Sequence, residues 1–318
     1  MIVLENPQGP NESEYVVVNP APETFKGRTI DLADPPLVSF CIPTLNNERT
    51  LGRCLHSIAN QDYPHQEIII VDGHSRDNTI RIAEQFTDEI YYDKGTLGSA
   101  RQTSIDHARG DVLALFDSDI IIPHRSWLSS AIRYFNYSDR VSTVWPANDP
   151  PPGKCLISRL YFNHWRMVME DRMRKKRGLF GGGNSLLLRR CMDEIGGVNR
   201  LLHWGEDFDW AGRLKRKGYQ VVFIRDALIH DTMRTLNEFS RKQSIGARTF
   251  TATGFQLMNL STWNVFYEQV VIGMKGMIVG ILIDTDPSWF LYPILLSLKG
   301  GAYANAYVAD SARKEGMI

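Results

Sequence analysis

Hydrophobic and polar positions follow two different periods through the middle of the chain. Short apolar runs rich in β-branched residues fall at 38–42 (VSFCI), 67–72 (EIIIVD), 89–93 (EIYYD) and 111–117 (DVLALFD). Between them lie stretches with helical spacing at 48–61, 77–86 and 99–108. The short runs predict strands and the longer stretches predict helices. Strands that alternate with helices form a mostly parallel sheet sandwiched by helices, so the predicted fold class is α/β.

The two ends of the chain have other patterns. Six of the 15 prolines fall in residues 1–36, a density that suits neither a helix interior nor a central strand. We therefore expect an extended N-terminal arm over 1–36 and a catalytic domain over 37–250. Residues 251–318, where apolar segments alternate with Gly and polar breaks, predict a C-terminal helical region.

Polar residues gather where the predicted strands end. Residues 46–48 follow the first strand, 72–77 follow the second, and 117–119 follow the fourth. Open α/β sheets bind ligands at the carboxyl ends of their strands. The sequence therefore predicts a ligand site at this edge.

The fourth strand is followed by Asp117, Ser118 and Asp119. Two carboxylates one residue apart suit a hard divalent cation whose shell is completed by phosphate oxygens. Asp-Ser-Asp is also good turn or helix-capping chemistry. Its position at the ligand edge favours the metal site.

The second strand ends in Asp72. A buried carboxylate there needs hydrogen-bond donors, and a nucleobase imide or amide would supply one. Pro43, Thr44 and Glu48, at the mouth of the first strand, are expected to border the same base and its ribose. The alternative is local: Asp72 as a turn residue and Asp77 as a helix cap.

Three carboxylates, Glu206, Asp207 and Asp209, lie at the start of a predicted helix. Compensation of the helix macrodipole explains acidic residues in a first turn. The alternative is a general base toward an acceptor hydroxyl. The preceding HWG and FGGGN stretches, rich in Gly and aromatic residues, suit a loop that closes over a sugar.

These segments together resemble the family 2 glycosyltransferases over roughly residues 37–250. The resemblance rests on PTLNNERTL, VDGHSRDNT, GSARQTSIDHARGDVLALFDSD, FGGGNSLLLRR and GEDFDWAGRLKRKGY, in that order. The family consists of inverting enzymes with the nucleotide-diphosphosugar transferase fold, the glycosyltransferase A fold. The resemblance implies that Asp72 reads the base, Arg101 approaches the diphosphate, Asp119 coordinates the metal with Asp117 assisting, and Asp207 is the catalytic base.

The resemblance also groups Ser118 with the donor-binding residues. It places His230, at the end of the strand-like ALIH, where related enzymes sometimes have a metal ligand. A lone histidine there is as often a satisfied structural residue.

The function that the resemblance implies is a metal-dependent inverting glycosyltransferase, a hexosyltransferase. It would use Mn²⁺ or Mg²⁺ and a nucleotide-sugar donor, a UDP-sugar favoured over a GDP-sugar, with a glycan or lipid-phosphate acceptor. Two departures bear on this. Asp72 is followed by Gly73 rather than a second acid, and the Q-x-x-R-W pattern of processive synthases is replaced by RKQSIGARTF, which favours single sugar addition.

Two other functions are alternatives. A sugar-nucleotide-forming nucleotidyltransferase favours a Gly-rich phosphate loop after the first strand, where this chain has only Gly52. An inactive sugar-binding module should have lost at least one of Asp72, Asp119 and Asp207.

Charge and cysteine content indicate which kinds of partner and which cellular compartment to expect. Thirty-six basic and 36 acidic residues give a formal net charge of zero, so no nucleic-acid partner is expected. The four cysteines lie far apart without disulfide or zinc spacing, and the N-terminus lacks a signal-peptide pattern. We expect a cytoplasmic protein, placed at the cytoplasmic face of the membrane; no pattern indicates an oligomeric state.

The C-terminal region predicts peripheral membrane contact. Its apolar segments at 270–283 and 289–298 are 14 and 10 residues long, short of the roughly 20 that span a bilayer. Interfacial aromatic residues are Trp263, Trp289, Tyr292 and Tyr303, and RMRKKR at 172–177 would add basic charge. The alternatives are packing against the catalytic domain or a second subunit, with RMRKKR as a solvated helix end.

Overall fold

The structure, a computed structural model, describes residues 15–18, 30–31, 33–153, 155–174, 183–253 and 267–314. The chain divides into two compact units. The sheet unit comprises Met1–Asn148 and Met173–His230, and the helical unit comprises Asp149–Arg172 and Asp231–Ile318. The domain boundaries expected at residues 36 and 250 stay a prediction.

The sheet unit is built on one sheet of nine strands among the described residues. The strands are β1 (Tyr15–Val18), β2 (Val38–Thr44), β3 (Gln66–Asp72), β4 (Ile90–Tyr92), β5 (Val112–Leu115), β6 (Ile120–Ile121), β7 (Val141–Asp149), β8 (Ser185–Leu188) and β9 (Gln220–His230). Their order is β1-β9-β7-β8-β5-β2-β3-β4, and β6 pairs with β9.

The sheet is parallel in one half and antiparallel in the other. Strands β4, β3, β2 and β5 run parallel, as the strand and helix alternation predicts. From β5 onward the observed pairs β5–β8, β7–β8, β6–β9 and β1–β9 are antiparallel. The α/β class is confirmed, but the sheet is mixed rather than mostly parallel. Its antiparallel half is made by β1 and by the later strands, where the regular alternation has ended.

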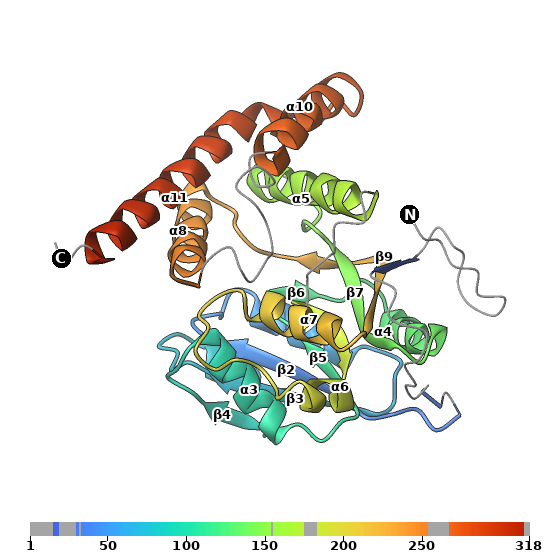
Figure 1. Ribbon diagram of the computed structural model, residues 1–318. Coiled ribbons are helices and arrows are strands. Elements are labelled where there is room, and N and C mark those ends of the chain that lie inside the picture. The colour runs from blue at the N-terminus through green and yellow to red at the C-terminus, as the bar shows by residue number, and fades with distance from the viewer. Residues whose placement is uncertain are drawn as a thin grey trace. The chain divides into compact units, whose positions relative to one another are not determined.

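Helices accompany this sheet. They are α1 (Leu51–Ala59), α2 (Thr79–Ala83), α3 (Leu97–His107), α4 (Trp127–Ile132), the 3₁₀ helix η1 (Arg133–Tyr137), α6 (Arg189–Glu194) and α7 (Glu206–Arg216). Helix α3 packs on β2 and β3, and α6 contacts both β8 and α7. In Figure 1, α3, α6 and α7 lie in front of the sheet.

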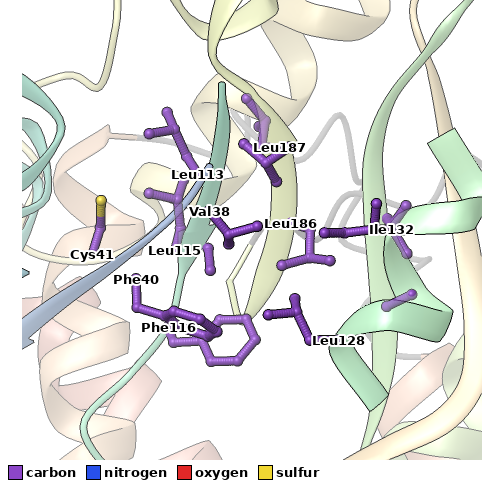
Figure 2. Packing of buried hydrophobic residues seen from close by; sticks show 14 of the residues in the cluster. Val38, Phe40, Cys41, Leu113, Leu115, Phe116, Leu128, Ile132, Leu186 and Leu187 are labelled. Atoms are coloured by element: carbon purple, nitrogen blue, oxygen red, sulfur yellow. The ribbon is translucent and has the colours of Figure 1, made fainter. Parts of the chain in front are cut away.

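The core of the sheet unit follows from the continuous apolar strands. Every residue of β2 is buried, as expected for a strand covered on both faces. Phe40 meets Phe116 edge to face, with ring centroids 5.4 Å apart. Figure 2 shows Leu115 and Leu186, from adjacent strands, beside Leu128 of α4. Burial of one such side chain contributes roughly 1.5–3 kcal/mol.

Strand β1 lies within the expected N-terminal arm. It pairs antiparallel with β9, with Val16 opposite Phe223 and Val17 opposite Val222. Most of the remaining arm lies outside the described residues. This strand was not predicted, because prolines lie on both sides of YVVV. Three consecutive valines are nonetheless typical of a strand.

The helical unit contains four α-helices and two shorter helical segments in its described part. They are α5 (Leu156–Arg174), α8 (Leu236–Thr253), the π-helix η3 (Tyr267–Val271), α10 (Ile272–Leu282), the 3₁₀ helix η4 (Pro287–Leu291) and α11 (Tyr292–Lys314). Helices α8 and α11 pack together, and the core includes Leu160, Phe239, Trp289 and Leu295. None of the helices in the described ranges has both the length and the hydropathy that crossing a membrane requires.

The basic cluster at 172–177 begins inside this unit. Arg172 is buried and makes a bidentate ion pair with Glu268, with Nε to Oε1 at 2.8 Å and Nη2 to Oε2 at 2.6 Å. Arg172 is therefore neither a solvated residue at a helix end nor a contact for lipid, because its charge is paired with Glu268 inside the helical unit. The other side chains of the cluster, like Trp263, lie outside the described residues.

Helix α10 packs mostly through glycine, and most of its exposed residues have large side chains. Gly276 and Gly280 face Trp289 so closely that an added Cβ would lie 2.1 Å and 2.0 Å from the indole. Lys275 is exposed. Four further exposed residues, from the end of η3 to the end of α10, carry large apolar side chains, and we call them the α10 outer face: Val271, Met274, Ile278 and Leu282. This is the reverse of an ordinary amphipathic helix, which buries its large apolar residues.

We expect Gly276→Ala to destabilise the helical unit by about 1–2 kcal/mol, because Trp289 is buried and must move to admit the methyl group. The matched control is Gly300→Ala in α11, where an added Cβ meets nothing within 4 Å. There the gain in helix propensity should stabilise by roughly 0.5–1 kcal/mol. Urea unfolding midpoints measure both effects, and a Gly276→Ala midpoint as high as that of Gly300→Ala would contradict the packing.

Candidate active site

The edge of the sheet opens between β2 and β5. Pairing of β2 with β5 ends at Cys41 opposite Leu115, whereas pairing of β2 with β3 continues to Thr44 opposite Asp72. Pro43 therefore lies past the pairing with β5, where its missing N–H costs no bond to that strand. The chain beyond Leu115 leaves β5 and carries the D-x-D motif to this edge.

The pairing of β6 with β9 sets the geometry of the candidate metal ligands. Ile120 lies opposite His230, the last residue of β9, which brings Asp119 beside the imidazole. The His230 Nε2 atom is 3.0 Å from Asp119 Oδ1 and 3.9 Å from Asp117 Oδ2. One donor atom from each of the three residues lies within 4.8 Å of the others. Two carboxylates and an imidazole form a donor set that fits Mn²⁺, and the role of the three as ligands stays a prediction.

Asp117 is held by two side chains from distant segments. Arg101 Nη2 donates to Oδ1 at 2.5 Å, and Asn184 Nδ2 donates to Oδ2 at 3.1 Å. Asn184 also accepts the Asp117 N–H at 2.8 Å and donates its own N–H to Leu115. Its φ of 58° lies in the left-handed region that Asn tolerates. Asn184 was not among the residues predicted for the site; its signal in the sequence is an Asn between a glycine run and an apolar strand.

Arg101, on α3, is 1% exposed and lies between two carboxylates. Its Nε donates to Glu206 Oε1 at 2.9 Å, and its guanidinium carbon is 5.9 Å from the centre of the Trp210 ring. Burial alone would lower the pKa of Arg101, but the charges of Asp117 and Glu206 outweigh it and raise that pKa, so the side chain stays cationic. The contact of Arg101 with a diphosphate stays a prediction.

The three carboxylates at the start of α7 have different partners. Gly205 precedes them with a φ of 77°. Glu206 is buried and bonds to Arg101, and Asp209 pairs with Arg213 at 2.7 Å. Asp207 is half-buried, and the bonds seen at its oxygens come from backbone groups, the Phe208 N–H at 3.0 Å and the Gly183 N–H at 3.4 Å.

Burial changes the pKa values of Glu206 and Asp207. It raises the pKa of Glu206 to about 7 and also raises the pKa of Asp207. Carboxylates with pKa values moved toward neutrality are suited to accept a proton near neutral pH. The macrodipole favours acidic residues in this turn as well, but it does not account for their burial.

Asp72 is fully buried and receives hydrogen bonds from the protein. Its Oδ2 accepts from the Thr44 hydroxyl at 2.9 Å and the Ser75 hydroxyl at 2.6 Å, and its Oδ1 accepts from the Ser75 N–H at 2.7 Å. These bonds compensate the burial of the carboxylate locally, so base reading by Asp72 stays a prediction.

Neighbouring polar residues at this edge support the local turns. Glu48 accepts from the backbone N–H and the side-chain amide of Asn78. Asp77 accepts from the Thr79 N–H in a local turn, but the N-cap of α2 is Asn78, so the expectation that Asp77 caps this helix is wrong. Ser118 is buried between the two carboxylates of the D-x-D motif. The donor contacts expected of Pro43, Thr44, Glu48 and Ser118 stay predictions.

The sequence and structure were compared with known proteins. Residues 39–196 match the model of glycosyl transferase family 2. Glycosyltransferase AglE of Haloferax volcanii is 27% identical over 217 residues, which are 65% of this chain and 71% of AglE. The chain belongs to glycosyl transferase family 2. This confirms the resemblance and the assignment as a transferase.

Solved structures show the same fold. The mannosyltransferase PcManGT from Pyrobaculum calidifontis, in complex with GDP-Man and Mn²⁺, has a TM-score of 0.59 at 17% identity, over 92% of this chain and 90% of that one. The Mycobacterium tuberculosis glucosyl-3-phosphoglycerate synthase, in complex with Mn²⁺ and UDP-glucose, has a TM-score of 0.50 at 16% identity, over 71% and 80%. The glycosyltransferase A fold is thereby confirmed.

We expect Asp119→Asn to weaken Mn²⁺ binding by at least about tenfold, because it removes one charged donor from the three-residue group. Titration calorimetry on the donor-free protein measures the affinity. The matched control is Asp226→Asn, which alters another carboxylate of the sheet unit paired with a histidine, His124, at 3.0 Å. Equal Mn²⁺ affinity in the Asp119 and Asp226 variants would rule out the metal site.

Proposed function

We propose that this family 2 member is a metal-dependent, inverting hexosyltransferase that moves a sugar from a nucleotide diphosphate sugar to a glycan or lipid-phosphate acceptor. The observation that carries the proposal is the assembly of Asp117, Asp119 and His230 at the carboxyl edge of the sheet, the edge that also carries Asp207. A cation site and a candidate base at one edge are the parts that displacement of a diphosphate needs. Retention of Asp72, Asp119 and Asp207 speaks against an inactive sugar-binding module.

Asp119, Asp117 and His230 are the residues that would hold the cation. A bound Mn²⁺ or Mg²⁺ would offset the negative charge that develops on the leaving diphosphate. Both compared structures were solved with Mn²⁺, which supports this assignment. They carry different nucleotides, GDP-Man and UDP-glucose, so a preference for a UDP-sugar over a GDP-sugar rests on Asp72 as acceptor for the uracil imide.

Asp207 is the residue we assign as general base. Among the three acidic residues of the α7 turn, Glu206 is bonded to Arg101 and Asp209 to Arg213, whereas the bonds seen at Asp207 come from the backbone. As the oxygen of an acceptor hydroxyl attacks the anomeric carbon, its proton passes to the Asp207 carboxylate and the bond to the diphosphate breaks; an ionised phosphate acceptor would need no such proton transfer. The attack is direct, so the configuration inverts and no covalent enzyme intermediate forms.

A lipid-linked acceptor agrees with the packing inside the helical unit. The four residues of the α10 outer face are apolar and exposed, with the exposed Lys275 among them, and Phe290 and Ile294 are exposed close by in the chain. Helices that pack through glycine and turn large aliphatic residues outward are typical of proteins in lipid, where burial of large residues brings no gain over contact with acyl chains. Helix α10 has 11 residues, so we propose that it lies along the membrane surface, at its cytoplasmic face.

We expect Asp207→Asn to lower the rate of transfer by about 10² or more, because the amide cannot accept the acceptor proton. Binding of UDP- and GDP-sugars should change little. Asp209→Asn is the matched control on the same helix and should retain transfer, since Asp209 is paired with Arg213. An active Asp207→Asn enzyme beside an inactive Glu206→Gln enzyme would assign the base to Glu206 instead.

We expect the paired change Ile278→Lys and Leu282→Lys to reduce co-sedimentation with phosphatidylglycerol-containing vesicles by at least about tenfold, because two exposed apolar side chains leave the lipid contact. The control is Ile245→Lys on α8, which alters an exposed apolar residue outside the α10 outer face. The wild type remaining in the supernatant, or the paired variant sedimenting like the control, would refute lipid contact. Loss of a lipid-free dimer in the paired variant would assign the face to a second subunit.

A further inference from the structure

Glu206 is connected to the candidate metal site through Arg101. We propose that Glu206 is a positioning residue which fixes Arg101, and that Arg101 in turn fixes the Asp117 carboxylate for cation binding. The inference rests on the proposed metal-dependent function and assigns a role to the second acidic residue of the α7 turn.

The contacts form an unbroken chain from α7 to the D-x-D motif. Glu206 Oε1 accepts from Arg101 Nε at 2.9 Å, and Asp117 Oδ1 accepts from Arg101 Nη2 at 2.5 Å. The side chains of Arg101 and Glu206 are 2% and 5% exposed, whereas that of Asp117 is 32% exposed. The solvent-accessible end of the chain is therefore the carboxylate at the metal site.

The planar guanidinium makes this chain stiff. Nε–H and Nη2–H lie on the same edge of the group, so a bond that fixes Nε also fixes the direction in which Nη2 donates. Arg101 is also covered by the Trp210 ring, which limits its other orientations. Without Glu206, the Nε–H would be buried without this acceptor, and the group would rotate or shift to find another.

The contacts of Arg101 distinguish the two carboxylate oxygens of Asp117 at the candidate metal site. Arg101 occupies Oδ1, while Oδ2 is the atom 3.9 Å from His230 Nε2. Asn184 Nδ2 bonds to Oδ2 from another segment, so both oxygens are tethered. This double tether makes Oδ2 the oxygen that Asp117 offers to a cation.

The rival role for Glu206 is general base. Its nearly complete burial and its bond to Arg101 disfavour contact with an acceptor hydroxyl. The two roles differ in what they need from the side chain. A base needs a carboxylate, whereas a positioning residue needs an acceptor oxygen at the correct distance.

The test compares Glu206→Gln with Glu206→Asp. Mn²⁺ affinity is measured by titration calorimetry on donor-free protein, and turnover is measured separately. The amide oxygen of Gln still reaches Arg101, so we expect Mn²⁺ binding to weaken by about threefold or less, whereas the shorter Asp should weaken it by about tenfold or more. Loss of charge alone predicts the opposite order, because Glu206→Asp keeps the charge.

A double-mutant cycle gives a second arm that does not depend on the folding of Glu206→Asp. Lysine is a single point charge that cannot bridge both carboxylates as Arg101 does. If Glu206 acts through Arg101, Glu206→Ala, which removes the acceptor oxygen, should weaken Mn²⁺ binding by about tenfold or more in the wild type and no further in Arg101→Lys. Asp209→Asn is the control on the same helix, and its Mn²⁺ affinity should equal that of the wild type.

Each outcome has one meaning. Wild-type protein that does not bind Mn²⁺ overturns the proposed metal dependence, and the positioning role with it. If the wild type binds and Glu206→Asp binds equally well, the positioning role alone fails. It also fails if Glu206→Gln keeps full Mn²⁺ affinity but loses turnover while Glu206→Asp retains turnover, or if the effect of Glu206→Ala persists beside Arg101→Lys.

Discussion

Crowding of negative charge is the constraint on which the candidate site depends. Asp117, Asp119, Glu206 and Asp207 all belong to one edge of the sheet, and Arg101 is the buried cation that pairs with two of them. Burial raises the pKa of Glu206 and of Asp207, and each of these pKa values is raised further by a neighbouring carboxylate. Carboxylates that repel one another at a sheet edge form a site in which a divalent cation relieves electrostatic strain. Arg101 offsets part of this negative charge through its contacts with Asp117 and Glu206.

The sequence predicted the parts of the structure that depend on local pattern. The strands from Val38 to Leu115, their parallel pairing and the placement of the D-x-D motif at a strand end follow from periodicity and from the rule that ligands bind at carboxyl edges. The contacts of Arg101 with Asp117 and Glu206 could not be derived in this way. They join residues 16 and 105 positions apart, and nothing in local spacing indicates which acid a buried arginine will meet.

The basic cluster at 172–177 shows how residue type alone can mislead. A run of arginine and lysine at a helix end suggests a surface, yet Arg172 is buried against Glu268 of η3. Glycines in α10 mislead in the opposite direction, since Gly in a helix usually weakens it. Here Gly276 and Gly280 admit the Trp289 ring against the helix backbone, and the large side chains of α10 are left outside. Only the packing of Trp289 shows which face of this helix is the inner one.

Two consecutive residues connect the two chemical roles proposed for the sheet unit. The Gly183 N–H donates to Asp207, the proposed base, and Asn184 bonds to Asp117 of the candidate metal group. An added Cβ at Gly183 would lie 3.2 Å from Asp207 Oδ2, so a larger residue would press on the base. Asn184 in turn needs a positive φ to present its amide to Asp117 while its N–H reaches Leu115. The glycine run before β8 thus has a physical reason at its described end: the missing side chain of Gly183 leaves room for Asp207, so that one short segment orients both the proton acceptor and a carboxylate of the cation site.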